Sequence, residues 1–199
     1  MPRLFVALEI SRDAAMRLAL LRGGLPAARW IDPENYHLTL RFIGDVEARF
    51  ADEAVAALDR IEAAPFDLQL LGLDAFGSKK PHSIYAGVAP SPALEALQGD
   101  VDRALRRIGL APDAKKFTPH VTLARLRQPK VEDVARYLAG RGDFRSAPFR
   151  VGRFVLFSSK DSVGGGPYLV EEAFDLTLRQ RQEIGSGAPM PAPAAALWR

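Results

Sequence analysis

The sequence predicts an α+β fold of two pseudo-symmetric lobes, each with an antiparallel sheet and helices, that face each other across a groove. Apolar residues make up 48% and charged residues 26% of the 199 residues, which is typical of a globular chain with a substantial core. A strand bearing a His-x-Thr-Leu segment, followed by a helix and further strands, occurs twice. We expect one bilobal domain over 1–182 and a flexible Pro/Ala/Gly-rich tail over 183–199.

The elements follow from hydrophobic periodicity and from residues that start or end helices. Ser11 and Ser91-Pro92 are helix-start signals, and the glycines at 23–24 and 109 are stop signals. Helices are expected at 11–22, 46–64, 91–108 and 131–138. Strands are expected at 4–9, 36–43, 66–73, 83–89, 118–127, 149–158 and 168–178, with a cationic loop at 77–81 and a glycine-rich turn at 164–167.

Composition also limits the classes of function. Lys and Arg exceed Asp and Glu to give a net charge of +3, which permits an anionic ligand. Cysteine is absent, which excludes a disulfide scaffold, thiolate nucleophiles and thiolate metal sites. No uncharged apolar run approaches the roughly 18 residues of a membrane span, and the first residues lack the pattern of a signal peptide. We therefore expect a cytoplasmic protein without a membrane partner.

Two of the three histidines are followed by Thr at the second position and Leu at the third. The two segments are His37-Leu-Thr39-Leu and His120-Val-Thr122-Leu. Residues i and i+2 of a strand share a face, so each segment directs an imidazole and a hydroxyl the same way.

This arrangement suits in-line displacement at phosphorus. One imidazole takes a proton from the attacking group, the other gives a proton to the leaving oxygen, and the threonine hydroxyls donate hydrogen bonds to the phosphate. An ordinary pKa of about 6.5 allows one imidazole to be neutral while the other is protonated.

Two other interpretations of the histidines compete with this one. A lone strand histidine is usually a hydrogen-bonded structural residue, but the repetition disfavours that explanation. A zinc site is disfavoured because the sequence has no Cys, no His-x-His and no metalloprotease pattern. We expect no metal and no cofactor.

The wider segments, NYHLTLRFIG at 35–44 and FTPHVTLAR at 117–125, resemble the two signatures of the two-histidine (2H) phosphoesterases. The chain is similar to the bacterial and archaeal RNA 2′,3′-cyclic phosphodiesterases, also called 2′-5′ RNA ligases, from its first strand to about residue 178. The resemblance implies the bilobal fold, a basic groove, and metal-independent hydrolysis of a terminal 2′,3′-cyclic phosphate to a 2′-phosphate, with reversible 2′-5′ RNA ligation as a further activity.

The resemblance also implies roles for individual residues. His120 would be the base for water and His37 the acid for the 3′-oxygen, although the reverse reaction exchanges these roles. Thr39 and Thr122 would hold the phosphate. Phe42 and Arg125, each five residues after a histidine, would contact the nucleotide by stacking or by charge.

Strict strand alternation disagrees with the last of these roles, because an odd offset places Phe42 and Arg125 on the face opposite the histidines. Either a bulge or the end of the strand redirects both residues, or Phe42 belongs to the core and Arg41 takes the outward position. We expect His82, Arg3, Arg150 and Arg153 to be ordinary loop or surface residues.

The expected partners are RNA ends or small cyclic nucleotides, bound by a monomer. One alternative is a related enzyme acting on ADP-ribose 1″,2″-cyclic phosphate or another cyclic nucleotide. Another is a module that binds RNA ends without turnover.

Overall fold

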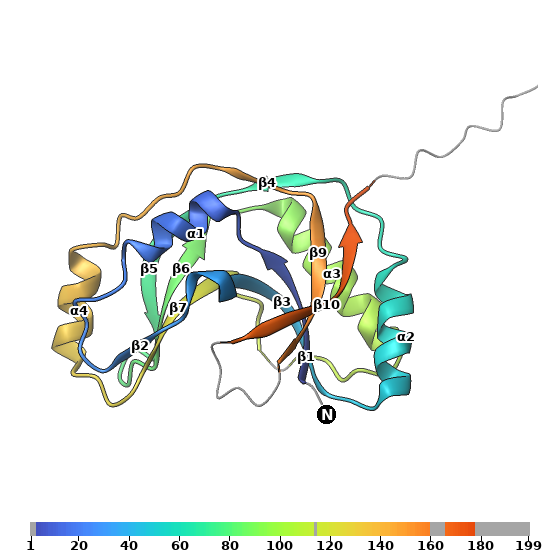
Figure 1. The fold of residues 1–199 in the computed structure, drawn as a ribbon, viewed down its shortest axis with the longest axis horizontal. Helices are drawn as coiled ribbons and strands as arrows, with labels where there is room; N and C mark the ends of the chain where they lie inside the picture. Colours follow the sequence, from blue (N-terminus) through green and yellow to red (C-terminus); the bar gives the residue numbers. More distant parts are fainter. Residues whose placement is uncertain (1–2, 114, 160–165, 178–199) are drawn as a thin grey trace, which may run out of the picture.

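The computed structural model describes residues 3–113, 115–159 and 166–177 (Figure 1). Its helices are α1 (Arg12–Ala19), η1 (a 3₁₀ helix, Pro33–Asn35), α2 (Ala48–Leu58), α3 (Pro92–Arg107) and α4 (Val131–Ala139). Its strands are β1 (Arg3–Glu9), β2 (Ala28–Trp30), β3 (His37–Asp45), β4 (Phe66–Leu68), β5 (Leu70–Phe76), β6 (Ser83–Val88), β7 (His120–Leu126), β8 (Phe149–Val151), β9 (Arg153–Ser159) and β10 (Tyr168–Asp175). The predicted tail at 183–199 and the first half of the predicted turn at 164–167 lie outside the described residues.

The main sheet confirms the predicted α+β class. Its strands run in the order β10-β9-β1-β3-β7-β6-β5, with β2 added beside β7. Every pairing between described strands is antiparallel. A single paired position, Leu38 opposite Val121, joins β3 to β7 and thus links the two groups of strands. The division into two lobes stays a prediction, because these strands form one continuous sheet.

The helices cover one face of this sheet. Buried residues of α1, α2, α3 and α4 pack with inward-facing residues of β3 and β7 in one large hydrophobic core. On the opposite face, a smaller cluster contains only residues of β1 and β9, with Tyr168 of β10 against it. In Figure 1, α4 lies at one end of the molecule and α2 and α3 lie at the other. The non-helical face is therefore the one that remains available to a ligand.

Local signals explain where two of the helices begin. The Ser11 hydroxyl accepts a hydrogen bond from the Ala14 amide at 3.3 Å, and the Ser91 hydroxyl accepts one from Leu94 at 3.3 Å. Helix α3 ends before Gly109, whose positive φ of 102° is accessible to glycine at little cost. None of the helices in the described residues is long and apolar enough to cross a bilayer.

Several predicted boundaries are wrong. The helix expected at 46–64 spans only Ala48–Leu58. The strand expected at 66–73 is divided at Gln69, whose side chain donates a hydrogen bond to the Ser146 carbonyl at 2.8 Å. The strand expected at 149–158 is divided at Gly152, so that β4 and β8 form a separate two-stranded sheet. Strand β2 was not predicted, because three residues are too few to show alternation.

Candidate active site

The two His-x-Thr segments lie side by side on β3 and β7. The antiparallel pairing of Leu38 with Val121 sets the register between them. Continued by one residue in each direction, that register places His37 across from Thr122 and Thr39 across from His120. The topology therefore gathers two imidazoles and two hydroxyls on one face of the sheet.

Burial follows the predicted alternation through the first four residues of each segment. His37 and Thr39 are half-buried on β3, and so are their counterparts His120 and Thr122 on β7. The residues between and after them, Leu38, Leu40, Val121 and Leu123, are buried in the large core. Each segment is thus anchored by its apolar face, which leaves the polar face partly accessible.

Backbone carbonyl groups hold both imidazoles in the same way. Nδ1 of His37 lies 2.8 Å from the carbonyl oxygen of Asn35, and Nδ1 of His120 lies 2.7 Å from that of Thr118. A carbonyl oxygen only accepts, so Nδ1 carries the hydrogen in each ring, and we assign the neutral tautomer on this basis. Nε2 of each histidine is left to exchange a proton with a substrate.

Bulges redirect the residues five positions after the histidines. Leu40 is skipped in the pairing of β3 with β1, where Arg41 and Thr39 oppose Val6 and Ala7. Leu123 is skipped likewise in the pairing of β7 with β6. Beyond the bulge the alternation changes phase, so Phe42 is 56% exposed and Arg125 is exposed. The bulge alternative is therefore right, and the placement of Phe42 in the core with Arg41 outward is wrong.

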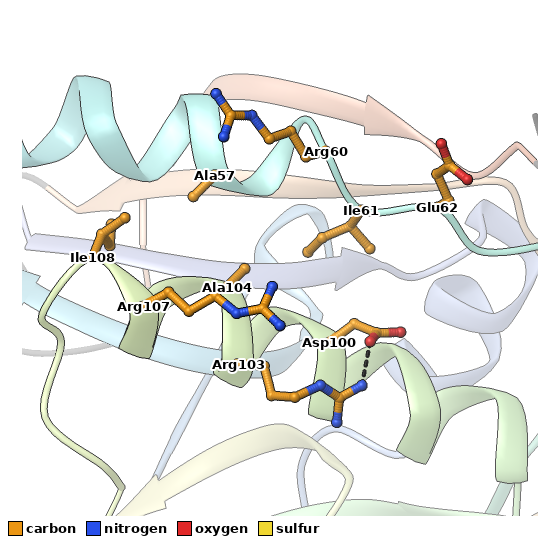
Figure 2. Close-up of a pocket in the computed structure, with 9 residues that line it drawn as sticks. All are labelled: Ala57, Arg60, Ile61, Glu62, Asp100, Arg103, Ala104, Arg107 and Ile108. Atoms are coloured by element: carbon orange, nitrogen blue, oxygen red, sulfur yellow. Dashed lines mark hydrogen bonds and ion pairs between the residues drawn. The ribbon is translucent and has the colours of Figure 1, made fainter.

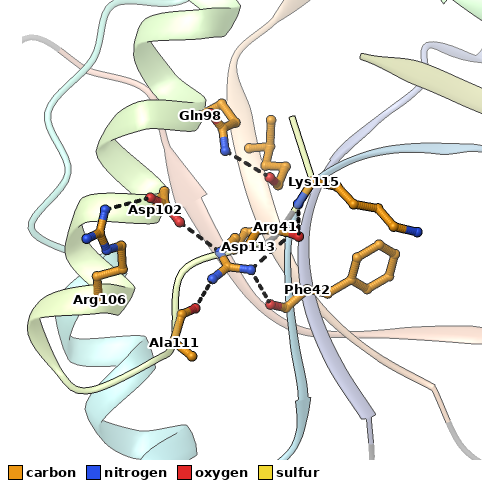
Figure 3. Close-up of polar contacts among 9 residues, drawn as sticks. Arg41, Phe42, Gln98, Asp102, Arg106, Ala111, Asp113 and Lys115 are labelled. Atoms are coloured by element: carbon orange, nitrogen blue, oxygen red, sulfur yellow. Dashed lines mark hydrogen bonds and ion pairs between the residues drawn. The ribbon is translucent and has the colours of Figure 1, made fainter. Parts of the chain in front are cut away.

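The buried Arg41 side chain connects three parts of the chain (Figure 3). The side chain is only 5% exposed. Its guanidinium lies 2.9 Å from Asp102 of α3 and 3.3 Å from Asp113. It also donates to the carbonyl oxygens of Ala111 and Phe42. The contacts at 111 and 113 fasten the segment that leads from α3 to β7. No local pattern signals this role for Arg41, because its partners are far apart in the chain.

Aromatic rings flank each histidine. The ring centroid of His37 lies 5.0 Å from Phe5 and 4.9 Å, edge-on, from Tyr168. The ring centroid of His120 lies 4.8 Å from Phe76 and 5.4 Å from Tyr85, both edge-on. These four residues were not predicted from the sequence, although aromatic residues at strand positions were the available signal. They restrict the motion of the imidazoles and limit their access to water.

Asn35 links His37 to the start of β10. Its carbonyl oxygen accepts from Nδ1 of His37, and its side-chain Oδ1 accepts from the backbone amide of Tyr168 at 3.3 Å. A Cβ atom on Gly166, which has a φ of +91°, would lie 2.3 Å from the Asn35 side chain. The absence of a side chain at 166 thus permits this close approach, and Tyr168 is held against His37.

Burial lowers the pKa of both histidines. The pKa of His37 falls to about 4, first because of burial and then because of the charges of His120 and Arg125, against the hydrogen bond to Asn35. The pKa of His120 is lowered by burial and by Arg125, against the hydrogen bond to Thr118. The positive charge of Arg125 thus disfavours protonation of both imidazoles. Near neutral pH the unliganded site therefore holds two uncharged imidazoles beside one cation.

The remaining basic residues singled out in the sequence make other contacts. His82 is exposed, its Nδ1 lies 3.3 Å from the Ser83 hydroxyl, and its ring lies parallel to that of Phe76 with the centroids 6.3 Å apart. Arg3, Arg150 and Arg153 form ion pairs with Asp45, Asp67 and Glu9. Within the described ranges, no group of three His, Asp or Glu side chains is arranged to hold a metal ion.

A hollow lies away from both histidines. It has a volume of about 260 Å³ and lies between α2 and α3, lined among others by Arg60, Arg103 and Arg107 (Figure 2). Asp100 and Glu62 lie among these arginines, and Arg103 forms an ion pair with Asp100.

Comparison with known families supports the chemistry suggested by this geometry. A family model described as the 2′-5′ RNA ligase superfamily matches residues 16–162. A Geobacillus stearothermophilus protein named RNA 2′,3′-cyclic phosphodiesterase is 36% identical over 61% of this chain, and the match spans 41% of that protein's length. An Aquifex aeolicus protein of the same name is 30% identical over 74% of this chain and 81% of its own length.

Solved structures show the same fold. TT0787 of Thermus thermophilus has a TM-score of 0.75 at 22% identity and covers 89% of this chain and all of its own. E. coli LigT complexed with 3′-AMP has a TM-score of 0.72 at 24% identity and covers 89% of this chain and 99% of its own.

Proposed function

We propose that this chain, which belongs to the 2′-5′ RNA ligase superfamily, hydrolyses terminal 2′,3′-cyclic phosphates of RNA to 2′-phosphates. The single observation that carries the proposal is the pairing of two His-x-Thr segments on adjacent strands, each with its imidazole Nδ1 fixed by a backbone carbonyl. Two proton-transfer groups and two hydroxyl donors then surround one phosphate.

The hydrolytic step uses the two imidazoles on opposite sides of phosphorus. Nε2 of His120 accepts a proton from water as the water oxygen bonds to phosphorus. The bond between phosphorus and O3′ breaks, and Nε2–H of His37 gives its proton to O3′. The products are a 2′-phosphate and a free 3′-hydroxyl, and in the reverse direction the two histidines exchange roles.

Thr39 and Thr122 donate hydrogen bonds to the non-bridging phosphate oxygens. Because each lies across from the histidine of the other strand, a phosphate held between the hydroxyls touches both imidazoles. Arg125 supplies the positive charge that attracts the anionic phosphate, and it stabilises charge that develops in the transition state. Phe42 offers an exposed ring on which the terminal base stacks.

Substrate binding also promotes protonation of the imidazole that acts as the acid. In the unliganded site burial disfavours protonation of His37. A phosphate anion beside the imidazole opposes this effect, because an opposite charge stabilises the imidazolium. The imidazole that acts as the acid therefore gains its proton together with the substrate; the assignment of His37 as this acid and of His120 as the base follows the family resemblance.

We also propose a domain organisation and a location for the protein. The domain comprises 1–182 and acts as a monomer on RNA ends in the cytoplasm, with 183–199 as an appended tail. Catalysis needs no metal, because the imidazoles perform both proton transfers and the hydroxyls and Arg125 bind the phosphate.

The test is hydrolysis of adenosine 2′,3′-cyclic phosphate by purified protein in excess EDTA. We expect only adenosine 2′-phosphate, with activity lost by at least about 10²-fold in His37→Ala and in His120→Ala. Arg150→Ala is the matched control, because this arginine pairs with Asp67 at the separate small sheet. Hydrolysis of ADP-ribose 1″,2″-cyclic phosphate alone would indicate the other substrate class, and binding without turnover would indicate a non-catalytic module. Loss of activity only in EDTA would contradict the mechanism.

A further inference from the structure

Two aromatic rings beside His120 have no function in the hydrolytic step. Phe76, the last residue of β5, and Tyr85 of β6 stack with ring centroids 4.2 Å apart and an interplanar angle of 24°. We propose that this pair binds a second nucleoside, the one whose 5′-hydroxyl attacks the cyclic phosphate when the enzyme forms a 2′-5′ linkage. The inference deepens the proposed function and rests on it.

The first support is that the rings of Phe76 and Tyr85 do not belong to a hydrophobic core. Among the described residues, neither Phe76 nor Tyr85 packs into the large core or the small cluster. Two rings near His37 differ in this respect, because Phe5 and Phe157 are 3% and 9% exposed and belong to the small cluster. Phe76 and Tyr85 are only half-buried. A stacked pair with open surface can bind a purine or pyrimidine ring.

The second support is that Tyr85 is held in place. Its hydroxyl donates a hydrogen bond to Oδ2 of Asp74 at 3.3 Å, across the β5–β6 pair. The two rings and His120 thus keep a fixed relation to one another. A rigid aromatic surface loses little conformational entropy when a base stacks on it.

The third support is the direction of attack. In an in-line displacement, the entering oxygen and the leaving O3′ lie on opposite sides of phosphorus. The leaving side belongs to His37, whose neighbour Phe5 also contacts the exposed ring of Phe42, and Phe42 takes the base of the cyclic nucleotide. The entering side belongs to His120, and therefore to Phe76 and Tyr85. Water occupies this side in hydrolysis, and a nucleoside 5′-hydroxyl occupies it in ligation.

The ligation step balances without a further reactant. The 5′-oxygen of the second nucleoside bonds to phosphorus, and its proton passes to Nε2 of His120. The bond between phosphorus and O3′ breaks, and O3′ receives the proton from His37. The product is a 2′-5′ phosphodiester with a free 3′-hydroxyl.

Positive charge continues beyond the aromatic pair. Lys79 and Lys80 follow Phe76 in the loop between β5 and β6, and both are exposed. Gly77 makes the turn tight, since its φ is +87° and a Cβ there would lie 2.3 Å from the Lys80 carbonyl oxygen. When the second nucleoside is the first residue of an RNA, its following phosphates extend toward these lysines.

The experiment measures two products from one reaction. Cytidine 2′,3′-cyclic phosphate is incubated with millimolar adenosine, and the ratio of 2′-5′ CpA to cytidine 2′-phosphate is determined. Phe76→Leu and Tyr85→Leu are expected to lower this ratio by about tenfold, because stacking of one base on an aromatic ring contributes about 1–3 kcal/mol. Tyr85→Phe retains the ring and is expected to retain most of the ratio. Any disturbance of His120 lowers both products alike, so the ratio isolates binding of the second nucleoside.

Phe42→Leu is the matched control, because it weakens binding of the cyclic nucleotide to the same extent in both reactions and leaves the ratio unchanged. An unchanged ratio in Phe76→Leu and Tyr85→Leu overturns the inference. So does a wild-type enzyme that hydrolyses the cyclic nucleotide but neither forms nor cleaves 2′-5′ CpA, and in that case the proposed hydrolytic function stands. Absence of hydrolysis by the wild type would instead refute the proposed function itself.

Discussion

Asn35 holds Tyr168 beside the active site: its side-chain oxygen accepts a hydrogen bond from the Tyr168 amide 133 positions later in the chain. The backbone oxygen of the same asparagine accepts from His37. One residue thus fixes both the orientation of an imidazole and the position of the ring that shields it. In the proposed mechanism Asn35 is a positioning residue, since it would act on the reaction through His37.

Asn35→Ala should raise the pKa of His37. The variant keeps the backbone acceptor but releases Tyr168, so water reaches an imidazole whose pKa of about 4 results mainly from burial. We expect the pKa to move upward toward its ordinary value of about 6.5 in an NMR titration of the histidine ring protons. His120 lies across the sheet junction and provides the internal control. An unaltered titration of His37 would show that Tyr168 does not depend on this hydrogen bond.

His37 should make the fold less stable in mild acid. Its pKa is lower in the folded protein than in the unfolded chain, so the unfolded state binds more protons as the pH falls from about 6.5 to about 4. The free energy of unfolding therefore declines over this range. In His37→Gln this contribution is removed, and the stability of the variant relative to wild type should increase toward pH 4 in urea unfolding. A difference independent of pH would contradict the lowered pKa.

Arg41→Met should destabilise the protein by about 2 kcal/mol, because it removes charge-assisted hydrogen bonds and leaves carbonyl oxygens without a donor. The arginine side chain is only 5% exposed and meets Asp102 and Asp113. Arg49→Ala is the control, since its ion pair with Glu53 involves an 89% exposed arginine side chain; we expect it to cost less than about 0.5 kcal/mol. Equal effects of the two substitutions in urea unfolding would mean that burial of Arg41 adds nothing to stability.

Phe42→Ala should affect binding more than folding. The ring is 56% exposed, whereas the next residue, Ile43, is 8% exposed. We expect Phe42→Ala to raise the KM for adenosine 2′,3′-cyclic phosphate about tenfold and to destabilise the fold by less than about 1 kcal/mol. Ile43→Ala should show the reverse pattern, with a loss of about 2–4 kcal/mol and little change in KM. The prediction fails if Phe42→Ala lowers the melting temperature as much as Ile43→Ala does.

Sequence reasoning identified the parts of the site that depend on local pattern. Alternation alone placed His37 and Thr39 on one face of a strand, and it did the same for His120 and Thr122. Serine caps marked the starts of two helices. These features depend on neighbours within a few residues, which is the range that a single sequence reveals.

Features that depend on pairing between distant segments could not be predicted in the same way. The bulges at Leu40 and Leu123 belong to the register between strands, and the sequence only allowed a choice between two outcomes for Phe42. Burial of Arg41 requires acidic partners about 60 and 70 positions away. The aromatic residues that flank His120 come from two other strands.

The paired bulges have a consequence for how such an enzyme diversifies. They place positions 42 and 125 outside both cores while the residues next to them remain buried. Phe42 occupies one of these equivalent positions and Arg125 the other, whereas the strand segments around them have the same pattern of burial. Substitutions at these two positions therefore do not disturb the packing of the hydrophobic core. Under the roles proposed for Phe42 and Arg125, single substitutions at these two positions would change substrate preference and leave the fold intact.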